Sequence, residues 1–168
     1  MTEIIVAGAG ALLLLILVVR AVLRVPTGQA VVLERFGRFR RIATAGLRVR
    51  VPLLDQVRAR VDLREQVITF PAARLRTRDD EHVAVALTVF CRITDVAAAV
   101  YEVANYLLAL EQLARAALAD EVDDLTRERA LHSRRALAHT LQAALDAEVN
   151  RWGITVTSVE LTIEPDES

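Results

Sequence analysis

Lysine is absent from this chain of 168 residues, so all 21 of its basic residues are arginine. The single cysteine, Cys91, excludes a disulfide framework, and one cysteine with three histidines argues against a self-contained structural zinc site. The aromatic residues are four Phe, two Tyr and one Trp, too few to give the arginines the stacking partners of a single-strand nucleic-acid binder. With 54% hydrophobic residues the chain is not disordered, and its length suits a membrane segment followed by one globular domain.

An apolar run dominates the first 24 residues. Residues 4–19 (IIVAGAGALLLLILVV) are sixteen apolar residues without a charge. As a helix they measure about 24 Å, slightly short of a hydrocarbon core of about 30 Å. Continuing through Arg20 to Leu23 gives about 30 Å if the Arg20 guanidinium reaches the interface. We therefore predict an uncleaved membrane anchor over residues 1–24.

Other interpretations of this run fit less well. A cleaved signal peptide needs a basic n-region and an A-x-A site, whereas only Thr2 and Glu3 follow Met1, and Val19-Arg20-Ala21 matches such a site poorly. A buried core helix would show a polar face, which this run lacks. A re-entrant hairpin stays open as an alternative, although the run contains no proline.

Charge is distributed unevenly behind a net charge of −1. Residues 20–64 hold eleven arginines against three acidic residues, a local charge of +8, and residues 65–168 hold ten arginines against eighteen acidic residues, −8. Because every arginine follows the apolar run, the positive-inside bias predicts a single-pass protein of the cell membrane with its domain on the cytoplasmic side. Solvated strand faces would explain the alternating arginines equally well. The alternative is contact with anionic headgroups, for which the candidates are Arg20, Arg24, Arg35, Arg38, Arg40 and Arg41.

Alternating apolar and polar residues predict short strands of a mostly antiparallel sheet between residues 25 and 70. The expected strands are Ala30–Phe36, Leu47–Val51 and Val57–Leu63, with Phe70-Pro71 closing the region. The clearest strand is 83–93 (VAVALTVFCRI), which places Cys91 among core aliphatic residues as a buried hydrophobe. A last strand, Ile154–Ile163, changes phase, which predicts a bulge near Thr157-Ser158.

Three helices are expected between these strands, each with a residue suited to cap its N-terminus. Asp95 begins a short helix that runs through Tyr101, and Asn105 and Ser133 begin two longer ones. The last helix ends at Trp152-Gly153, where glycine can adopt a left-handed conformation. The apolar stripes of the longer helices are Leu107, Leu110, Leu113, Ala114, Ala117 and Leu118 in the first, and Leu137, Leu141 and Leu145 in the second.

No motif predicts catalysis, so we expect a protein that is not an enzyme and holds no cofactor or metal. Cys91, Ser133 and Ser158 lack the context of a nucleophile elbow, which leaves a hydrolase only as a remote third hypothesis. His132 and His139 could share a helix face, but two ligands do not make a metal site. The acidic groups Asp79-Asp80-Glu81 and Asp120–Asp124 do not match a calcium loop and are interpreted as a loop and a solvated helix end.

A series of short motifs resembles the stomatin-type branch of the SPFH (prohibitin-homology, band 7) family, from about Val25 to Glu164. Single motifs are weak, but their shared order over most of the chain is specific. They are Val25-Pro26-x-Gly28, Val32-x-Glu34-Arg35-Phe36-Gly37-Arg38, Gly46-Leu47, Val61-Asp62-Leu63-Arg64-Glu65-Gln66-Val67, Phe70-Pro71, Thr77-x-Asp79, Arg92-Ile93-x-Asp95, Tyr101 to Tyr106, Leu145-Asp146, Arg151-Trp152-Gly153-Ile154 and Val159-Glu160-Leu161.

The resemblance implies an α+β protein: a membrane helix, then an SPFH domain over 25–164 with a mostly antiparallel sheet and packed helices, and an acidic tail at 165–168. It also implies a membrane scaffold that assembles into homo-oligomers and organises lipid microdomains or membrane proteins. Relatives continue into a long Ala/Glu-rich helix, whereas this chain stops at Ser168, and we expect it to lack that helix. This difference motivates an alternative function, a regulatory subunit of a membrane protease or channel with an NfeD-type partner and little self-assembly.

Overall fold

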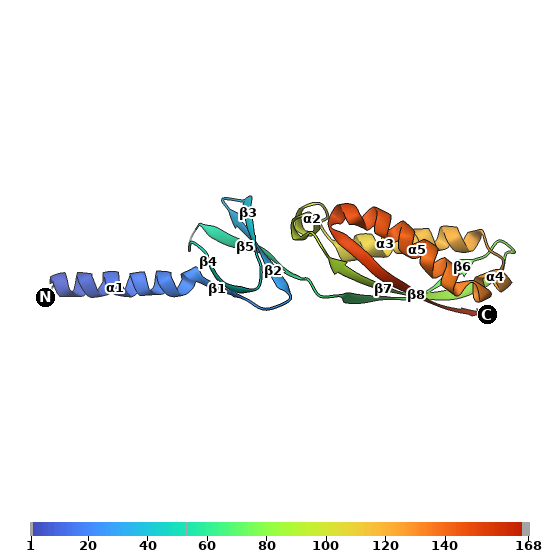
Figure 1. The fold of residues 1–168 in the computed structure, drawn as a ribbon, viewed down its shortest axis with the longest axis horizontal. Coiled ribbons are helices and arrows are strands. Elements are labelled where there is room, and N and C mark those ends of the chain that lie inside the picture. The colour runs from blue at the N-terminus through green and yellow to red at the C-terminus, as the bar shows by residue number, and fades with distance from the viewer. Residues whose placement is uncertain (1, 53, 166–168) are drawn as a thin grey trace. The chain divides into compact units, whose positions relative to one another are not determined.

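A computed structural model describes residues 2–52 and 54–165 (Figure 1). The chain divides into two compact units, Met1–Leu63 and Arg64–Ser168, which we call the first and the second unit. The acidic tail predicted at 165–168 lies outside the described residues beyond Pro165.

The described part of the first unit contains one helix and five strands. They are α1 (Thr2–Ala21), β1 (Val22–Val25), β2 (Gln29–Arg35), β3 (Arg38–Ala43), β4 (Gly46–Val49) and β5 (Asp55–Asp62). β1 pairs with β4, and β2 lies between β3 and β5; every pair is antiparallel. The expectation of a mostly antiparallel sheet is thus confirmed here, although β1 and β3 were not predicted as strands.

The apolar helix ends earlier than predicted, because Leu23 belongs to the core of the first unit. α1 ends at Ala21, and Leu23, expected as its last residue, belongs to β1. The Leu23 side chain is buried because it packs in a small core with Val25, Val31, Leu33 and Ala43. Full burial of a leucine contributes about 1.5–3 kcal/mol, which exceeds what one more helical residue would add.

α1 presents apolar side chains to its surroundings. Its exposed residues include Leu12, Leu13, Leu15, Ile16, Val18 and Val19. Nevertheless, within residues 2–52 and 54–165 no helix combines the length and hydropathy of a bilayer span. The C-terminus of α1 is held by Arg50, whose backbone N–H donates to the Ala21 carbonyl at 2.8 Å and whose Nε donates to the Arg20 carbonyl at 3.1 Å.

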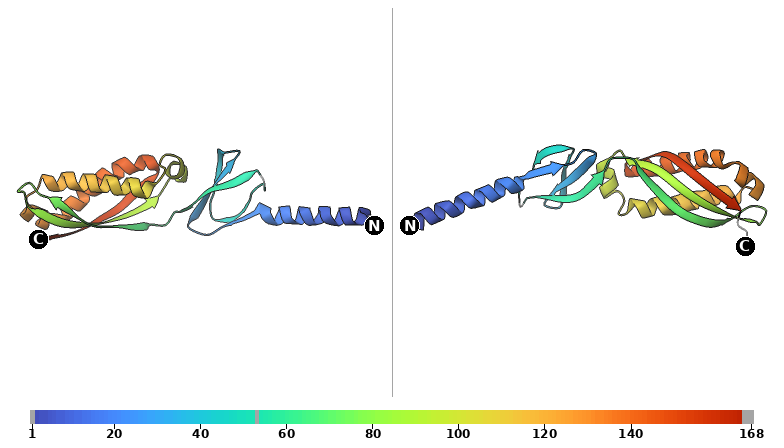
Figure 2. Two further views of the ribbon diagram at one scale, coloured as in Figure 1. Left: turned by 180° about the vertical axis from the view of Figure 1, so that it is seen from behind. Right: turned by 90° about the horizontal axis from the view of Figure 1, so that it is seen from below.

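The described part of the second unit contains three long strands, four α-helices and one 3₁₀ turn. They are β6 (Gln66–Arg76), β7 (His82–Ile93), α2 (Val96–Tyr101), α3 (Tyr106–Asp123), α4 (Arg127–His132), α5 (Arg134–Val149), a 3₁₀ turn η1 (Asn150–Trp152) and β8 (Ile154–Pro165). The strand order is β6-β7-β8, antiparallel throughout. Figure 2 shows α3 and α5 on one side of this sheet.

Alternation along β7 explains this two-layer arrangement. Every second residue from Val83 to Ile93 is buried, and Cys91 is buried among them as predicted. The helices contribute residues at helical spacing: Leu110, Ala114, Leu118 and Val122 from α3, and Leu137, Leu141, Leu145 and Val149 from α5. The core therefore lies between one face of the sheet and these two helices.

Several local predictions for the second unit are confirmed. The Asp95 carboxylate accepts hydrogen bonds from the N–H groups of Ala97 and Ala98 at 2.9 and 3.1 Å, as expected of an N-cap. Asn105 caps α3, and the register of β7 and β8 shifts at Cys91↔Val156 and Phe90↔Ser158, which places the predicted bulge at Thr157.

Two expectations about the ends of elements are wrong, and one helix was not expected. α4, capped by Thr126, was not expected, and Ser133 follows it without a side-chain capping bond. Pro71 does not close a region but lies inside β6, at a register shift between Phe70 and Ala73. An edge strand tolerates this proline because its outer side needs no N–H donor.

Candidate functional site

The turn between β2 and β3 gathers aromatic and basic side chains at one exposed point. We call residues 35–41 (RFGRFRR) the basic hairpin. Phe36 is 81% exposed at its tip and Phe39 is 49% exposed. Phe36 has φ 53°, in the left-handed region that a bulky side chain rarely adopts, and Gly37 follows with φ 74°. The turn thus holds an aromatic ring out of the folded core at a cost in backbone strain.

Asp55 organises the base of this hairpin. Its carboxylate is buried and accepts a hydrogen bond from Arg35 Nε at 2.8 Å and from the Val51 backbone N–H at 2.8 Å. Arg40 Nη1 lies 3.7 Å from the same oxygen that Arg35 contacts. One buried anion therefore fixes two arginines on neighbouring strands.

Hydrogen bonding lowers the pKa of Asp55. The Val51 backbone N–H contributes most, followed by the Arg35 side chain; burial acts in the opposite direction, and the charges of Arg35 and Arg40 lower the pKa further. The carboxylate therefore stays ionised at neutral pH, although it is almost entirely removed from solvent.

The six arginines predicted to contact headgroups do not share one environment. Arg20 lies in the last turn of α1 and Arg24 on β1, both exposed. The other four belong to the basic hairpin. There, Arg35 and Arg40 contact Asp55, and Arg41 donates to the Val49 carbonyl. Arg38, at the start of β3, is exposed beside Phe36 and Phe39, and headgroup contact by these residues stays a prediction.

Sequence reasoning did not identify the apolar half of this surface. Outside α1, the exposed large apolar side chains of the first unit are Val22, Phe36, Phe39, Leu47, Val49, Val51, Leu54 and Val57. β4 is exposed at all four of its positions. The alternation of apolar residue and arginine from Leu47 to Val51 predicts a half-buried strand, whereas β4 exposes both Leu47 and Arg48.

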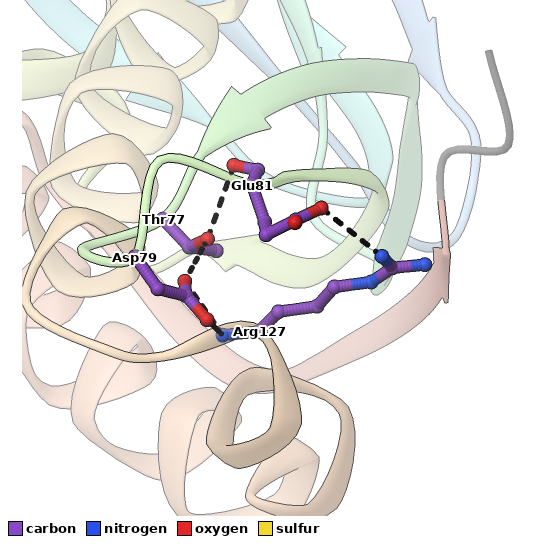
Figure 3. Close-up of polar contacts among 4 residues, drawn as sticks. All are labelled: Thr77, Asp79, Glu81 and Arg127. Atoms are coloured by element: carbon purple, nitrogen blue, oxygen red, sulfur yellow. Dashed lines mark hydrogen bonds and ion pairs between the residues drawn. The ribbon is translucent and has the colours of Figure 1, made fainter.

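A second polar cluster lies in the second unit, at the turn between β6 and β7 (Figure 3). Asp79 accepts a hydrogen bond from the buried Thr77 hydroxyl at 2.6 Å and from the Arg127 backbone N–H at 3.1 Å. Arg127 also forms an ion pair with Glu81 at 3.1 Å. We call these four residues the turn latch, because they join the turn to the start of α4 over 48 positions of sequence.

The turn latch gives the Thr77-x-Asp79 motif a structural role. The pKa of Asp79 is lowered, chiefly by the Thr77 hydroxyl, with burial opposing and the Arg127 backbone N–H adding to the effect. An ionised carboxylate at a helix N-terminus satisfies an N–H group that has no partner inside the helix. Asp79-Asp80-Glu81 is therefore a loop, as expected, but one that caps a distant helix.

We expect Asp79→Asn to increase amide exchange in α4 several-fold, with little change in α3. Because the folded pKa of Asp79 is lowered, its contribution to stability is present above the unfolded pKa of about 3.9 and is lost as pH falls through the folded value. Hydrogen–deuterium exchange at neutral pH should show the difference, and at a pH below the folded value the two proteins should converge.

Asp80→Asn is the matched control for this variant. Asp80 adjoins Asp79, but its side chain forms an exposed ion pair with Arg76 at 3.3 Å and does not belong to the turn latch, so exchange in α4 should stay as in the wild type. Equal effects of the two variants would show that Asp79 is not the cap of α4.

The other candidates for chemistry are not brought together. Cys91 is buried, and burial raises the pKa of its thiol, which makes it a poor nucleophile. His132 ends α4 whereas His139 lies in α5. In the described ranges, no group of three or more His, Cys, Asp or Glu side chains is placed to hold a metal ion.

Comparison with known proteins places these features in a family. The sequence model described as SPFH domain / Band 7 family matches residues 23–167. An uncharacterised protein of Mycobacterium tuberculosis is 39% identical over 155 residues, which cover 92% of this chain and 41% of the relative. An uncharacterised protein of Methanothermobacter thermautotrophicus is 34% identical over 80% of this chain and 42% of its own length.

A human relative carries a more informative name. Stomatin-like protein 2, mitochondrial, of Homo sapiens is 32% identical over 140 residues, 83% of this chain and 39% of the relative. The chain thus spans about two fifths of the length of the curated relatives it matches.

Proposed function

Because the chain belongs to the SPFH domain / Band 7 family, we propose that it is a membrane-associated, non-enzymatic scaffold whose copies associate at a lipid surface. The observation that carries this proposal is the apolar surface of α1. Six large aliphatic side chains between Leu12 and Val19 are 46–66% exposed. Exposed apolar side chains in this number are unfavourable in water and are stabilised by burial in acyl chains.

The basic hairpin supplies a second contact with lipid. Phe36 and Phe39 can enter the interfacial region while Arg38 and its neighbours meet anionic headgroups. The charge distribution supports an orientation with both units on the cytoplasmic side, where anionic lipid is enriched. Each arginine near such a surface contributes about 1 kcal/mol.

The test measures binding of residues 22–168 to vesicles of phosphatidylcholine with and without phosphatidylserine. The truncation begins at Val22 so that β1 and the buried Leu23 are retained. Replacing both Arg38 and Arg40 with Gln should weaken binding to anionic vesicles by about 30-fold, since two contacts contribute about 2 kcal/mol. Phe36→Ser should weaken binding to both vesicle types.

The control carries the same charge change on the second unit. Arg134→Gln with Arg135→Gln alters two exposed arginines of α5, and its binding should match that of the wild type. If the two double variants lose equal affinity, net charge alone governs binding and the basic hairpin has no special part in it.

A further inference from the structure

Among the described residues of the second unit, no helix covers one of the two faces of the sheet. α3 and α5 pack against the face formed by Val83, Val85 and their alternates (Figure 2). Residues directly opposite each other in an antiparallel pair project to the same side. We call the other side the open face; it contains Val67, Thr69 and Arg74 of β6, Ala84, Ala86, Thr88, Phe90 and Arg92 of β7, and Thr155, Ser158, Glu160, Thr162 and Glu164 of β8.

The centre of the open face carries small side chains. Ala84, Ala86 and Thr88 follow one another along β7, each intermediate in exposure. Val67, directly opposite Phe90, is 59% exposed and gives one end an apolar character. Small central side chains with an apolar end allow another sheet to approach closely.

Opposite charges lie at the two margins of this face. Ala84 is paired with Arg74 on β6 and with Glu164 on β8, so the two charged residues share one row, about 10 Å apart across the central strand. Arg76 extends the positive margin opposite His82, and Glu160 extends the negative margin opposite Thr88. Arginines therefore lie on the β6 margin, where Arg76 also pairs with Asp80, and glutamates lie on the β8 margin.

Both edges of the sheet are closed to strand addition over part of their length. On β8, Asp146 accepts a hydrogen bond from the Val156 N–H at 2.9 Å, and Gln142 donates to the Thr157 carbonyl at 2.9 Å. On β6, Pro71 has no N–H and lies at a register shift. Such features prevent edge-to-edge pairing, which leaves the open face as the more favourable surface for contact between copies.

We propose that two copies of this chain pack through their open faces, related by a two-fold axis that runs approximately along β7. This inference rests on the self-association proposed above. Such an axis brings Arg74 of each copy over Glu164 of the other and places Ala86 of one copy opposite Ala86 of the other. A two-fold axis across the strands would instead superpose like charges.

The contact is of limited size. Three strands about 14 Å wide and about 34 Å long bury roughly 1,000 Å² in total, the low end for a specific interface. Copies held on one surface gain effective concentration, which strengthens a contact of this size. The dimer is thus expected where the chains are concentrated rather than in dilute solution.

Cross-linking of the full-length chain in membranes from expressing cells tests the arrangement. Ala86→Cys places a thiol near the axis, and a short bismaleimide should join two copies into a covalent dimer. Wild-type protein controls for Cys91, which is buried. Thr140→Cys, exposed on α5 on the helical side, is the matched control and should give little dimer.

Exchanging the charges of Arg74 and Glu164 distinguishes the proposed face-to-face packing from random collision of two copies. Arg74→Glu or Glu164→Arg alone should reduce the cross-linked fraction of Ala86→Cys several-fold, and the two changes together should restore it. The mass of the extracted full-length protein, measured by light scattering, identifies which idea fails. A monomer overturns the proposed self-association; an oligomer whose Ala86→Cys dimer does not exceed that of Thr140→Cys overturns the face-to-face packing alone.

Discussion

Gly153→Ala is expected to destabilise the second unit by about 3–5 kcal/mol, because two unfavourable effects coincide at this residue. Gly153 has φ 66°, which costs an L-residue about 1 kcal/mol or more. A methyl group there would also lie 2.3 Å from the Asp95 carbonyl oxygen. Since that atom belongs to the backbone, the chain itself would have to move.

The contacts of Gly153 explain why this movement is costly. Its carbonyl accepts hydrogen bonds from the N–H groups of Thr94 and Asp95 at 2.8 and 3.0 Å, and from the Thr94 hydroxyl at 3.2 Å. These bonds join Thr94, which follows β7, and Asp95, the N-cap of α2, to the residue that precedes β8. Any shift that accommodates a methyl group breaks them together.

Gly37→Ala provides the matched control for this prediction. Gly37 also has a positive φ, 74°, but a methyl group would meet no atom within 4 Å, so its cost should be near 1 kcal/mol. Chemical denaturation gives the two free energies of unfolding, and hydrogen exchange assigns each loss to its unit. Losses of equal size would show that strain alone, and not the approach to Asp95, makes glycine necessary at 153.

Asp55→Ala is expected to destabilise the first unit by about 3 kcal/mol. Removing the carboxylate leaves the partly buried Arg35 guanidinium and the Val51 N–H without their acceptor. Arg58→Ala is the control, because its ion pair with Glu34 is longer, 3.6 Å, and the Arg58 side chain is 58% exposed. That variant should lose less than about 1 kcal/mol.

The pH dependence of Asp55→Asn has a defined sign. Because the folded pKa of Asp55 is lowered, its contribution is fully present above the unfolded pKa of about 3.9 and is lost as pH falls through the folded value. Wild type and Asp55→Asn should therefore differ in free energy of unfolding at neutral pH and approach each other in acid. A difference that does not change with pH would contradict the role of the ionised carboxylate.

Local signals explain which parts of the fold could be predicted. Asp95 and Asn105 cap helices through bonds to residues two or three positions away, so the sequence alone contains both partners. The bulge at Thr157 follows from a change of apolar phase within one strand. Cys91 was placed by alternation over eleven residues of β7, which repeats at every second position.

Tertiary contacts explain the failures. Leu23 follows an apolar run, and only the core formed by β2 and β3 assigns it to a strand. α4 is six residues long, and its first N–H groups depend on Thr126 and on Asp79, the latter 48 positions away. No window of local sequence contains that partner.

The arginines of the basic hairpin could be predicted from the sequence, but the exposure of its aromatic side chains could not. The arginines at 35–41 are evident from composition, whereas the exposure of Phe36 depends on a left-handed turn that no propensity predicts for phenylalanine. The role of Asp55 required knowing that β2, β3 and β5 are neighbours. The open face, likewise, results from the strand order, which places Arg74 and Glu164 on opposite sides of Ala84.

The junction of α1 and β1 has no flexible linker that could separate movement of the helix from the rest of the unit. Ala21 ends the helix and Val22 begins the strand with no linker between them, while Arg50 holds the last carbonyls of α1. A force on the helix is therefore not absorbed by rotation about backbone bonds between α1 and β1. It passes into the pairing of Val22 with Val49 and reaches the buried Leu23 one residue later, so a mechanical load on α1 acts directly on the core of the first unit.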